Sequence, residues 1–140
     1  MEEKKEQILN SSSHTRTMVE TLGIEIVEVE DGYAVATMPV DERTCQVYGI
    51  LNGGASVALQ ETVAGVGSVF LCGEDEMPCG AQISANHIAM VPVGNTVKAI
   101  GKILHKGRTT HIWSIDVVDH TDNLISTSRV VNIIVKRRTA

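Results

Sequence analysis

Residues 49–71 decide the fold and read GILNGGASVALQETVAGVGSVFL. The pair Gly53-Gly54 precedes a segment, Ala55 to Leu71, that is rich in alanine, valine and leucine and holds one acid, Glu61. Its apolar residues surround most of a helical cylinder, which predicts a helix buried in the core. About five turns fit, and Gly65 and Gly67 interrupt them, so we do not expect a membrane span.

The flanking sequence predicts strands. Upstream, residues 24–40 carry β-forming residues on both sides of Asp31-Gly32, the strongest short-range hairpin signal. Upstream of that hairpin, a weakly amphipathic helix is expected over residues 4–22. Downstream, turn residues separate four further expected strands. These are Ala81 to Met90, Thr96 to His105, Thr109 to Val118 and Leu124 to Lys136.

One sheet curled around one apolar helix is the simplest way to cover that helix. We therefore predict an α+β fold in which an antiparallel sheet of about six strands wraps one long central helix, with a short N-terminal helix. The 140 residues fit one domain, 1–140. Open sheet edges are commonly paired with a second copy, so at least a dimer is expected.

Composition narrows the function. The net charge of −5 argues against nucleic-acid binding. The charged N-terminus has no apolar segment of a secretion signal behind it, and three cysteines cannot all pair within one chain, so free thiols in the cytoplasm are expected. The histidines lack the spacing of a metal site.

The segment Gln46 to Thr62 resembles the signature of the PaaI-like branch of the 4-hydroxybenzoyl-CoA thioesterase family, in the hotdog superfamily. Weaker similarities follow at Asn86-His87, ahead of Pro92-x-Gly94, and at residues 104–108, and the resemblance covers roughly residues 24–135. It implies an acyl-CoA thioesterase of the hotdog fold that acts on a small aryl- or acyl-CoA thioester. No cofactor is expected, because CoA is part of the substrate.

The resemblance also implies site residues. Glu61 takes the place of the catalytic carboxylate, Gly53 or Gly54 offers a backbone N–H to the thioester oxygen, and Gln46 assists at the same carbonyl. Many relatives have histidine where this chain has Asn52, and asparagine cannot carry a proton. Relatives often place serine or threonine at the position of Gly65 to orient water.

The chemistry explains why these residue types suit the reaction. Hydrolysis of a thioester builds negative charge on the carbonyl oxygen, and N–H donors at a helix N-terminus stabilise it. An acid buried among apolar residues has a raised pKa suited to a general base, which is what we expect of Glu61. The alternatives are that the glycine pair only forms a tight turn and that Glu61 is a solvent-facing or interface-paired acid.

The spacing between Gly53 and Glu61 also predicts how the subunits are arranged. Gly53 and Glu61 are separated by about 12 Å along one helix, too far to serve one carbonyl. If two helices lie antiparallel across a dimer, Gly53 of one chain approaches Glu61 of the other. The resembled family is built in this way, and we expect a homodimer, or a homotetramer made as a dimer of dimers.

Further residues are candidates for binding the substrate. Lys106 and Arg108 flank Gly107, next to His105, and two cations in a strand connection suit the phosphates of CoA. Ordinary solvation of the turn explains them nearly as well. His87, beside Asn86, could lie near the acyl pocket. An acyl-carrier protein could replace CoA as the carrier of the thioester.

Two other function classes stay open. An acyl-thioester dehydratase or hydratase of the same fold typically uses a histidine with an acid in a different motif, which this sequence lacks. A non-catalytic acyl-CoA-binding or regulatory module would not require Glu61. Release of free thiol from CoA esters discriminates among the three classes.

Overall fold

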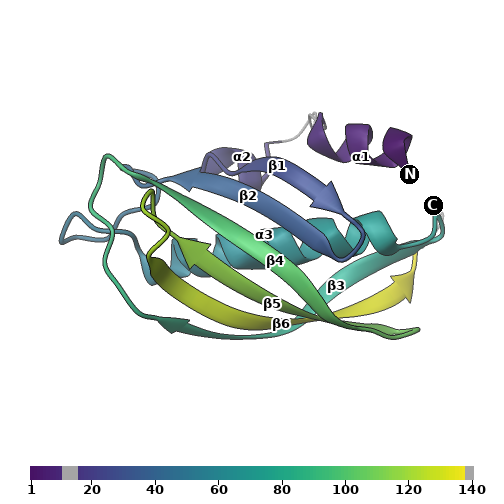
Figure 1. Ribbon diagram of the computed structural model, residues 1–140. Coiled ribbons are helices and arrows are strands. Elements are labelled where there is room, and N and C mark those ends of the chain that lie inside the picture. The colour runs from purple at the N-terminus through teal and green to yellow at the C-terminus, as the bar shows by residue number, and fades with distance from the viewer. Residues whose placement is uncertain (11–15, 138–140) are drawn as a thin grey trace.

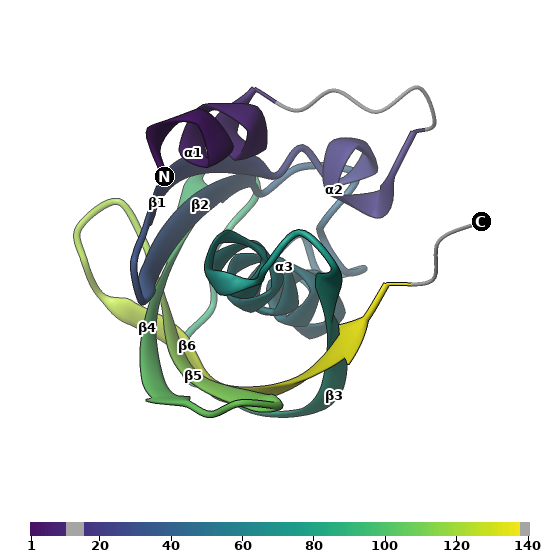
Figure 2. The same ribbon diagram turned by 90° about the vertical axis from the view of Figure 1, so that its right-hand side faces the viewer.

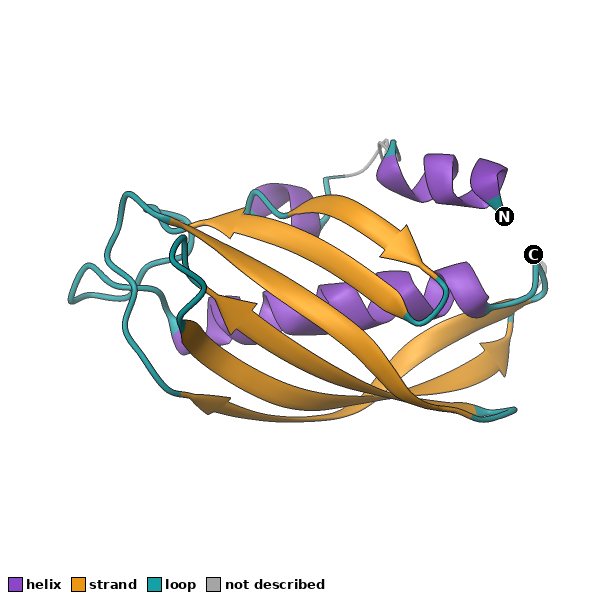
Figure 3. Ribbon diagram, viewed as in Figure 1, coloured by secondary structure: helices purple, strands orange, loops and turns teal. Residues whose placement is uncertain are grey.

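The computed structural model describes residues 1–10 and 16–137. Its elements are α1 (Glu2–Leu9), α2 (Met18–Thr21), β1 (Glu25–Glu30), β2 (Tyr33–Pro39), α3 (Gly53–Leu71), β3 (Glu76–His87), β4 (Thr96–Lys106), β5 (Thr110–Val118) and β6 (Leu124–Lys136). Figure 3 distinguishes the helices from the strands.

The six strands form one antiparallel sheet in the order β1-β2-β4-β5-β6-β3 (Figure 1). Viewed end-on, the sheet curves around α3, while α1 and α2 lie on the side that the sheet leaves open (Figure 2). This arrangement confirms the predicted fold class. It also leaves β1 and β3 as the two edge strands of the sheet.

β3 begins five residues before the strand predicted at Ala81, and it ends at His87 rather than at Met90. The prediction missed its start because Pro78 and Gly80 interrupt the strand pattern. Proline is tolerated in an edge strand, which need not donate on its outer side. The register against β6 shifts between Gly80 and Gln82, as at a β-bulge.

The N-terminal helix predicted over residues 4–22 is wrong in extent, because the structure has two separate helices there. The second starts at an N-cap, Thr17, whose side chain accepts a hydrogen bond from the Glu20 N–H at 3.4 Å. A polar run interrupts the sequence of the predicted helix, and residues 11–13 of that run lie outside the described residues.

α3 packs its sheet-facing side into the core. Leu59, Val63 and Phe70 are buried there against Trp113, which is itself fully buried. Gly67 permits this packing, because a Cβ at that position would lie 2.6 Å from Trp113 Cζ2. By length and composition α3 could cross a membrane, but half of that apolar stretch is buried in the chain, as in the core helix of a globular fold.

A polar cluster lies inside this core. Ser68 Oγ accepts a hydrogen bond from Trp113 Nε1 at 2.9 Å and from Asn132 Nδ2 at 3.1 Å, and lies 2.8 Å from His111 Nδ1. Burial is the main cause that lowers the pKa of His111, and the nearby charge of Lys106 lowers it further.

Because His111 is buried in this cluster, we expect the folded protein to lose stability in acid. Because the pKa of His111 is lower in the folded chain than in the unfolded chain, the unfolded state binds the proton first as pH falls below about 6.5. We expect the free energy of unfolding to be unaffected by this group above that pH and to decrease below it, by at most about 1.4 kcal/mol per pH unit. Urea denaturation between pH 7.5 and 5, at fixed protein concentration, measures the decrease. His111→Asn should flatten it, and an unchanged slope in that variant would count against this origin.

Candidate active site

The first turn of α3 is capped by Asn52. Its Oδ1 accepts a hydrogen bond from the Gly54 N–H at 2.7 Å. The cap therefore occupies the N–H of Gly54, one of the two glycines predicted to donate to a thioester oxygen. Within the described part of the chain, the Gly53 N–H has no hydrogen-bond acceptor, so Gly53 is the better of the two candidates.

His87 lies against this helix start. A Cβ on Gly53 would be 2.8 Å from His87 Nε2, so only glycine allows the imidazole to approach so closely. The two residues border a pocket of about 210 Å³. Ile50, Leu51, Ser56, Ile88, Ala89, Met90 and Ile125 complete its lining. The structure thus brings the predicted residues Gly53 and His87 together.

Asn86 does not join this pocket. Successive side chains in a strand point to opposite faces, so the Asn86 side chain lies on the face of β3 opposite to that of His87. Its backbone carbonyl instead accepts a hydrogen bond from Ser126 Oγ at 3.2 Å. Within one chain, therefore, His87 lines this pocket and the Asn86 side chain does not.

Gln46 sits in the loop that leads into α3. Its Oε1 accepts a hydrogen bond from the Tyr48 N–H, which orients the carboxamide so that Nε2 remains as the donor. The loop is closed by the Gln46 N–H, which donates to the Ile50 carbonyl at 2.8 Å. Val47 and Tyr48, at the tip, are 94% and 84% exposed.

Glu61 lies on the side of α3 that the sheet does not cover. It is exposed in the single chain, so the expectation of a carboxylate buried among the apolar residues of its own helix is wrong. If Gly80 of β3 carried a Cβ, that atom would lie 3.7 Å from Glu61 Oε1. One turn further along α3, a Cβ on Gly65 would have none of the described residues within 4 Å.

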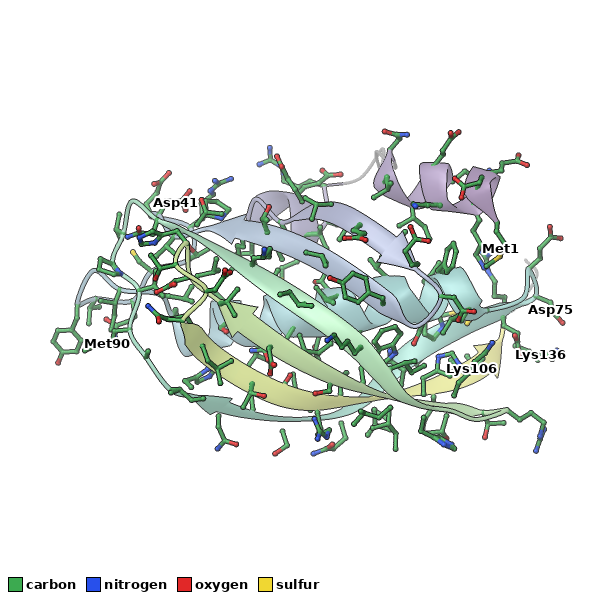
Figure 4. All side chains as sticks on the ribbon, in the orientation of Figure 1. Met1, Asp41, Asp75, Met90, Lys106 and Lys136 are labelled. Atoms are coloured by element: carbon green, nitrogen blue, oxygen red, sulfur yellow. The ribbon has the colours of Figure 1, made fainter. Side chains whose placement is uncertain are left out.

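The predicted phosphate-binding residues lie at the other end of the molecule. His105, Lys106 and Arg108 are exposed around the β4–β5 turn, where the Gly107 N–H donates to the Thr110 carbonyl at 2.8 Å. Lys106 and Lys136 lie at one end of the molecule and Met90 at the opposite end (Figure 4). Within one chain the turn is therefore remote from the pocket at Gly53.

A large hollow was missed by the sequence analysis. It has a volume of about 1200 Å³ and lies between the N-terminal helices and α3. Thr62, Val66 and Val69 of α3 line it from one side and Ile8 and Val19 from the other. The sequence carries no motif for it, because its walls come from segments far apart in the chain.

Comparison with known proteins places the chain in a family. Residues 48–126 match the model of the thioesterase superfamily. The Bacillus subtilis protein ComA2 is 47% identical over 122 residues, covering 86% of this chain and 96% of that one. A 1,4-dihydroxy-2-naphthoyl-CoA hydrolase of Listeria monocytogenes is 40% identical over 119 residues, covering 85% and 96%.

Among solved structures, two variants of the Staphylococcus aureus protein SAV0944 are each 36% identical to this chain, with TM-scores of 0.83 and 0.82. Each comparison covers 86% of this chain, and 100% and 98% of the respective neighbour. One variant replaces a glutamate by alanine and the other a glutamine by alanine. The two substituted positions are fifteen residues apart, the same separation as between Gln46 and Glu61.

The antiparallel sheet curled around α3 is that of a hotdog-fold protein. The chain belongs to the thioesterase superfamily and is a thioester hydrolase.

Proposed function

We propose that the protein hydrolyses a small aryl- or acyl-CoA thioester to the free acid and CoA, at a site shared by two subunits. Glu61 of one subunit is the catalytic carboxylate, and Gly53 and Gln46 of the other bind the thioester oxygen. The observation that carries the proposal is the separation of these groups in one chain, where the open Gly53 N–H begins α3 and Glu61 lies more than two turns away.

The unpaired edge of β3 supports a dimer of this kind. β3 is 12 residues long, lies at the sheet edge and is mostly exposed. Such an edge is a template for pairing with another strand. Two-fold pairing of β3 with its copy would extend the sheet and bring the uncovered sides of two α3 helices together, antiparallel. The exposed carboxylate of Glu61 would then be covered by the partner.

A second apolar surface supports pairing of dimers into a tetramer. It lies on the outer face of the sheet, where four hydrophobic side chains are between 37% and 56% exposed. These are Met77, Leu104, Ile133 and Val135. Apolar side chains gathered on one face mark a contact surface.

In the shared site, the Gly53 N–H and Gln46 Nε2 donate hydrogen bonds to the thioester oxygen as negative charge develops on it. Glu61 either takes a proton from an attacking water or attacks the acyl carbon to form a mixed anhydride that water then hydrolyses. By either route the carbon–sulfur bond breaks, the CoA thiolate leaves, and water supplies the oxygen of the acid. The identical spacing of the glutamine and glutamate substituted in SAV0944 supports these two assignments.

The large hollow is the proposed place of the acyl group. Thr62, which lines it, is the residue after Glu61 in α3, so one wall of the hollow lies within a helical turn of Glu61. Its walls include aliphatic residues of α1, α2 and α3, which suit an apolar acyl or aryl group.

We also propose that the reaction takes place in the cytoplasm. The free thiols of Cys45, Cys72 and Cys79 fit a reducing compartment of this kind.

The β4–β5 turn is the proposed contact for the CoA phosphates. In an antiparallel dimer this turn would lie at the same end of the assembly as the partner's α3 N-terminus. Lys106 and Arg108 make no salt bridge with any residue in the described ranges, so both charges are open to a ligand.

Arg108→Ala should raise KM for a CoA ester about threefold to tenfold while leaving KM for the shorter pantetheine ester unchanged, because only the CoA ester carries the nucleotide phosphates. Steady-state kinetics with both substrates measures the difference. Arg43→Ala is the matched control, since Arg43 already pairs with Asp41 at 2.7 Å. Equal losses with the two substrates would refute the nucleotide contact.

The function itself is tested by incubating the protein with a panel of aryl- and acyl-CoA esters. A chromogenic disulfide reagent measures the free thiol that is released. Enzyme-dependent release of thiol from at least one ester is the expected result. Binding of CoA esters without thiol release would identify a non-catalytic module, and release of no thiol together with addition or loss of water would identify a hydratase or dehydratase.

A further inference from the structure

A row of three residues crosses the sheet on the face that packs against α3. His111 of β5 pairs with Asn132 of β6, which in turn pairs with Gly80 of β3. Residues that lie directly opposite in neighbouring strands share one face of the sheet. The side chains of His111 and Asn132 both contact α3. Gly80 has no side chain, so the row ends in a gap at the edge of the sheet.

The carboxamide of Asn132 is held in one orientation. The residue is 2% exposed, and Nδ2 donates hydrogen bonds to the Ala64 carbonyl at 3.2 Å and to Ser68 Oγ at 3.1 Å. A carbonyl oxygen only accepts hydrogen bonds, so a flipped carboxamide would set two acceptors against each other at Ala64. Asn132 Oδ1 therefore points away from Ala64, and it accepts no hydrogen bond from any residue in the described ranges.

This free acceptor and the carboxylate of Glu61 border the same gap. A Cβ on Gly80 would lie 3.9 Å from Asn132 Oδ1 and 3.7 Å from Glu61 Oε1. Gly80 is exposed in the single chain, so water can enter the gap. Gly65, the helical neighbour of Glu61 one turn further along α3, has no side chain that could bind such a water. Asn132 is thus a partner for it supplied by the sheet.

We propose that Asn132 binds the attacking water together with Glu61. The water lies beside Gly80 and donates one hydrogen bond to the Glu61 carboxylate and the other to Asn132 Oδ1. Because both protons point to fixed acceptors, a lone pair of the water points away from them, toward the acyl carbon. The inference rests on the proposed thioesterase function and concerns its general-base route.

The step that Asn132 assists is the addition of water to the thioester. The water oxygen forms a bond to the acyl carbon, and an electron pair of the carbonyl group moves to the thioester oxygen. One water proton passes to Glu61, while the other stays on the new hydroxyl group, hydrogen-bonded to Asn132. Collapse of this intermediate breaks the carbon–sulfur bond, and the CoA thiolate takes up the proton that Glu61 holds.

Gly80→Ala tests the inference without altering Asn132. The new methyl group would make ordinary van der Waals contact with both oxygens, so it takes the space of the water without a clash. The backbone of Gly80 lies outside the left-handed region, so alanine can adopt it. We expect kcat to fall at least about tenfold at unchanged KM, with an unchanged or higher melting temperature. Size-exclusion chromatography checks that the oligomer is retained.

Asn132→Leu removes the acceptor itself, because leucine has a similar shape and no polar atom. It should lower kcat at least about tenfold without raising KM. Ser128→Ala is the matched control, since Ser128 is also buried on β6 and its oxygen has no partner among the described residues. That control should leave kcat unchanged. An equal fall in kcat in both variants would overturn the inference, because any disturbance of β6 would then suffice.

A high-resolution crystal structure of the wild-type protein shows directly whether water occupies the gap. We expect an ordered water within hydrogen-bond distance of both Glu61 and Asn132 Oδ1, and no such water in Gly80→Ala. Absence of the water from the wild-type protein, or a Gly80→Ala variant with wild-type kcat, would overturn the inference. A wild-type protein that hydrolyses no thioester would overturn the proposed function instead, and the crystal structures would still decide whether the two residues bind water.

Discussion

Replacing Glu61 by alanine is expected to lower kcat for thioester hydrolysis at least about a hundredfold while the protein stays folded, because the carboxylate acts on the reacting groups and supports none of the core. The side chain is exposed in the single chain, so its removal leaves no cavity. Steady-state kinetics with a CoA ester that the wild-type protein hydrolyses measures the loss, and circular dichroism checks the fold.

Glu28→Ala is a suitable control for this substitution. Glu28 is also an exposed glutamate, on β1 rather than α3, and its loss should leave kcat unchanged. Turnover of Glu61→Ala near the wild-type level would refute the assignment of the catalytic carboxylate. A fall in kcat of the same size in both variants would point to a loss of net charge rather than to catalysis.

The second large effect concerns stability and compares two glycines of α3. Gly67→Ala should lower the free energy of unfolding by about 1–3 kcal/mol, because the new methyl group overlaps the buried ring of Trp113. Gly65→Ala should raise it by about 0.5–1 kcal/mol, because alanine is the better helix former and its Cβ meets open space within the chain. Urea denaturation of both variants at one protein concentration measures the difference.

These two substitutions control each other, since both replace glycine by alanine in the same helix. If both variants shift the unfolding transition in the same direction and by the same amount, helix propensity alone would explain the result. The close packing of Gly67 on Trp113 would then contribute nothing to stability.

Local patterns predicted much of the sheet. The Asp31-Gly32 turn joins β1 and β2 as expected, and β6 has the predicted bounds, because alternation along a strand and turn residues are properties of adjacent positions. The position of β3 beyond β6 depends on contacts between distant segments, and no local pattern contains it. The start of β3 was hidden by Pro78 and Gly80, which an edge strand tolerates.

The site was predicted unevenly for a similar reason. The motif around Gly53 placed a helix start where the structure has one. The position of His87 against that helix start comes from the structure and not from the motif. The count of apolar residues around α3 could not show which side the sheet covers, so it favoured a buried Glu61 over the exposed one that the structure has. The hydrogen bonds that buried Gln60 Nε2 donates to Ser56 Oγ and Ser126 Oγ were also missed, because a glutamine in an apolar run indicates no partner until the sheet places Ser126 beside it.

The sharing of one site by two subunits is the central claim, and mixed dimers test it most directly. Glu61→Ala and Gln46→Ala, each inactive alone, would be unfolded together and refolded as a mixture. If each site takes Glu61 from one subunit and Gln46 from the other, half of the dimers contain one intact site, and activity should return to about a quarter of the wild-type level. A mixture as inactive as its components would contradict a shared site.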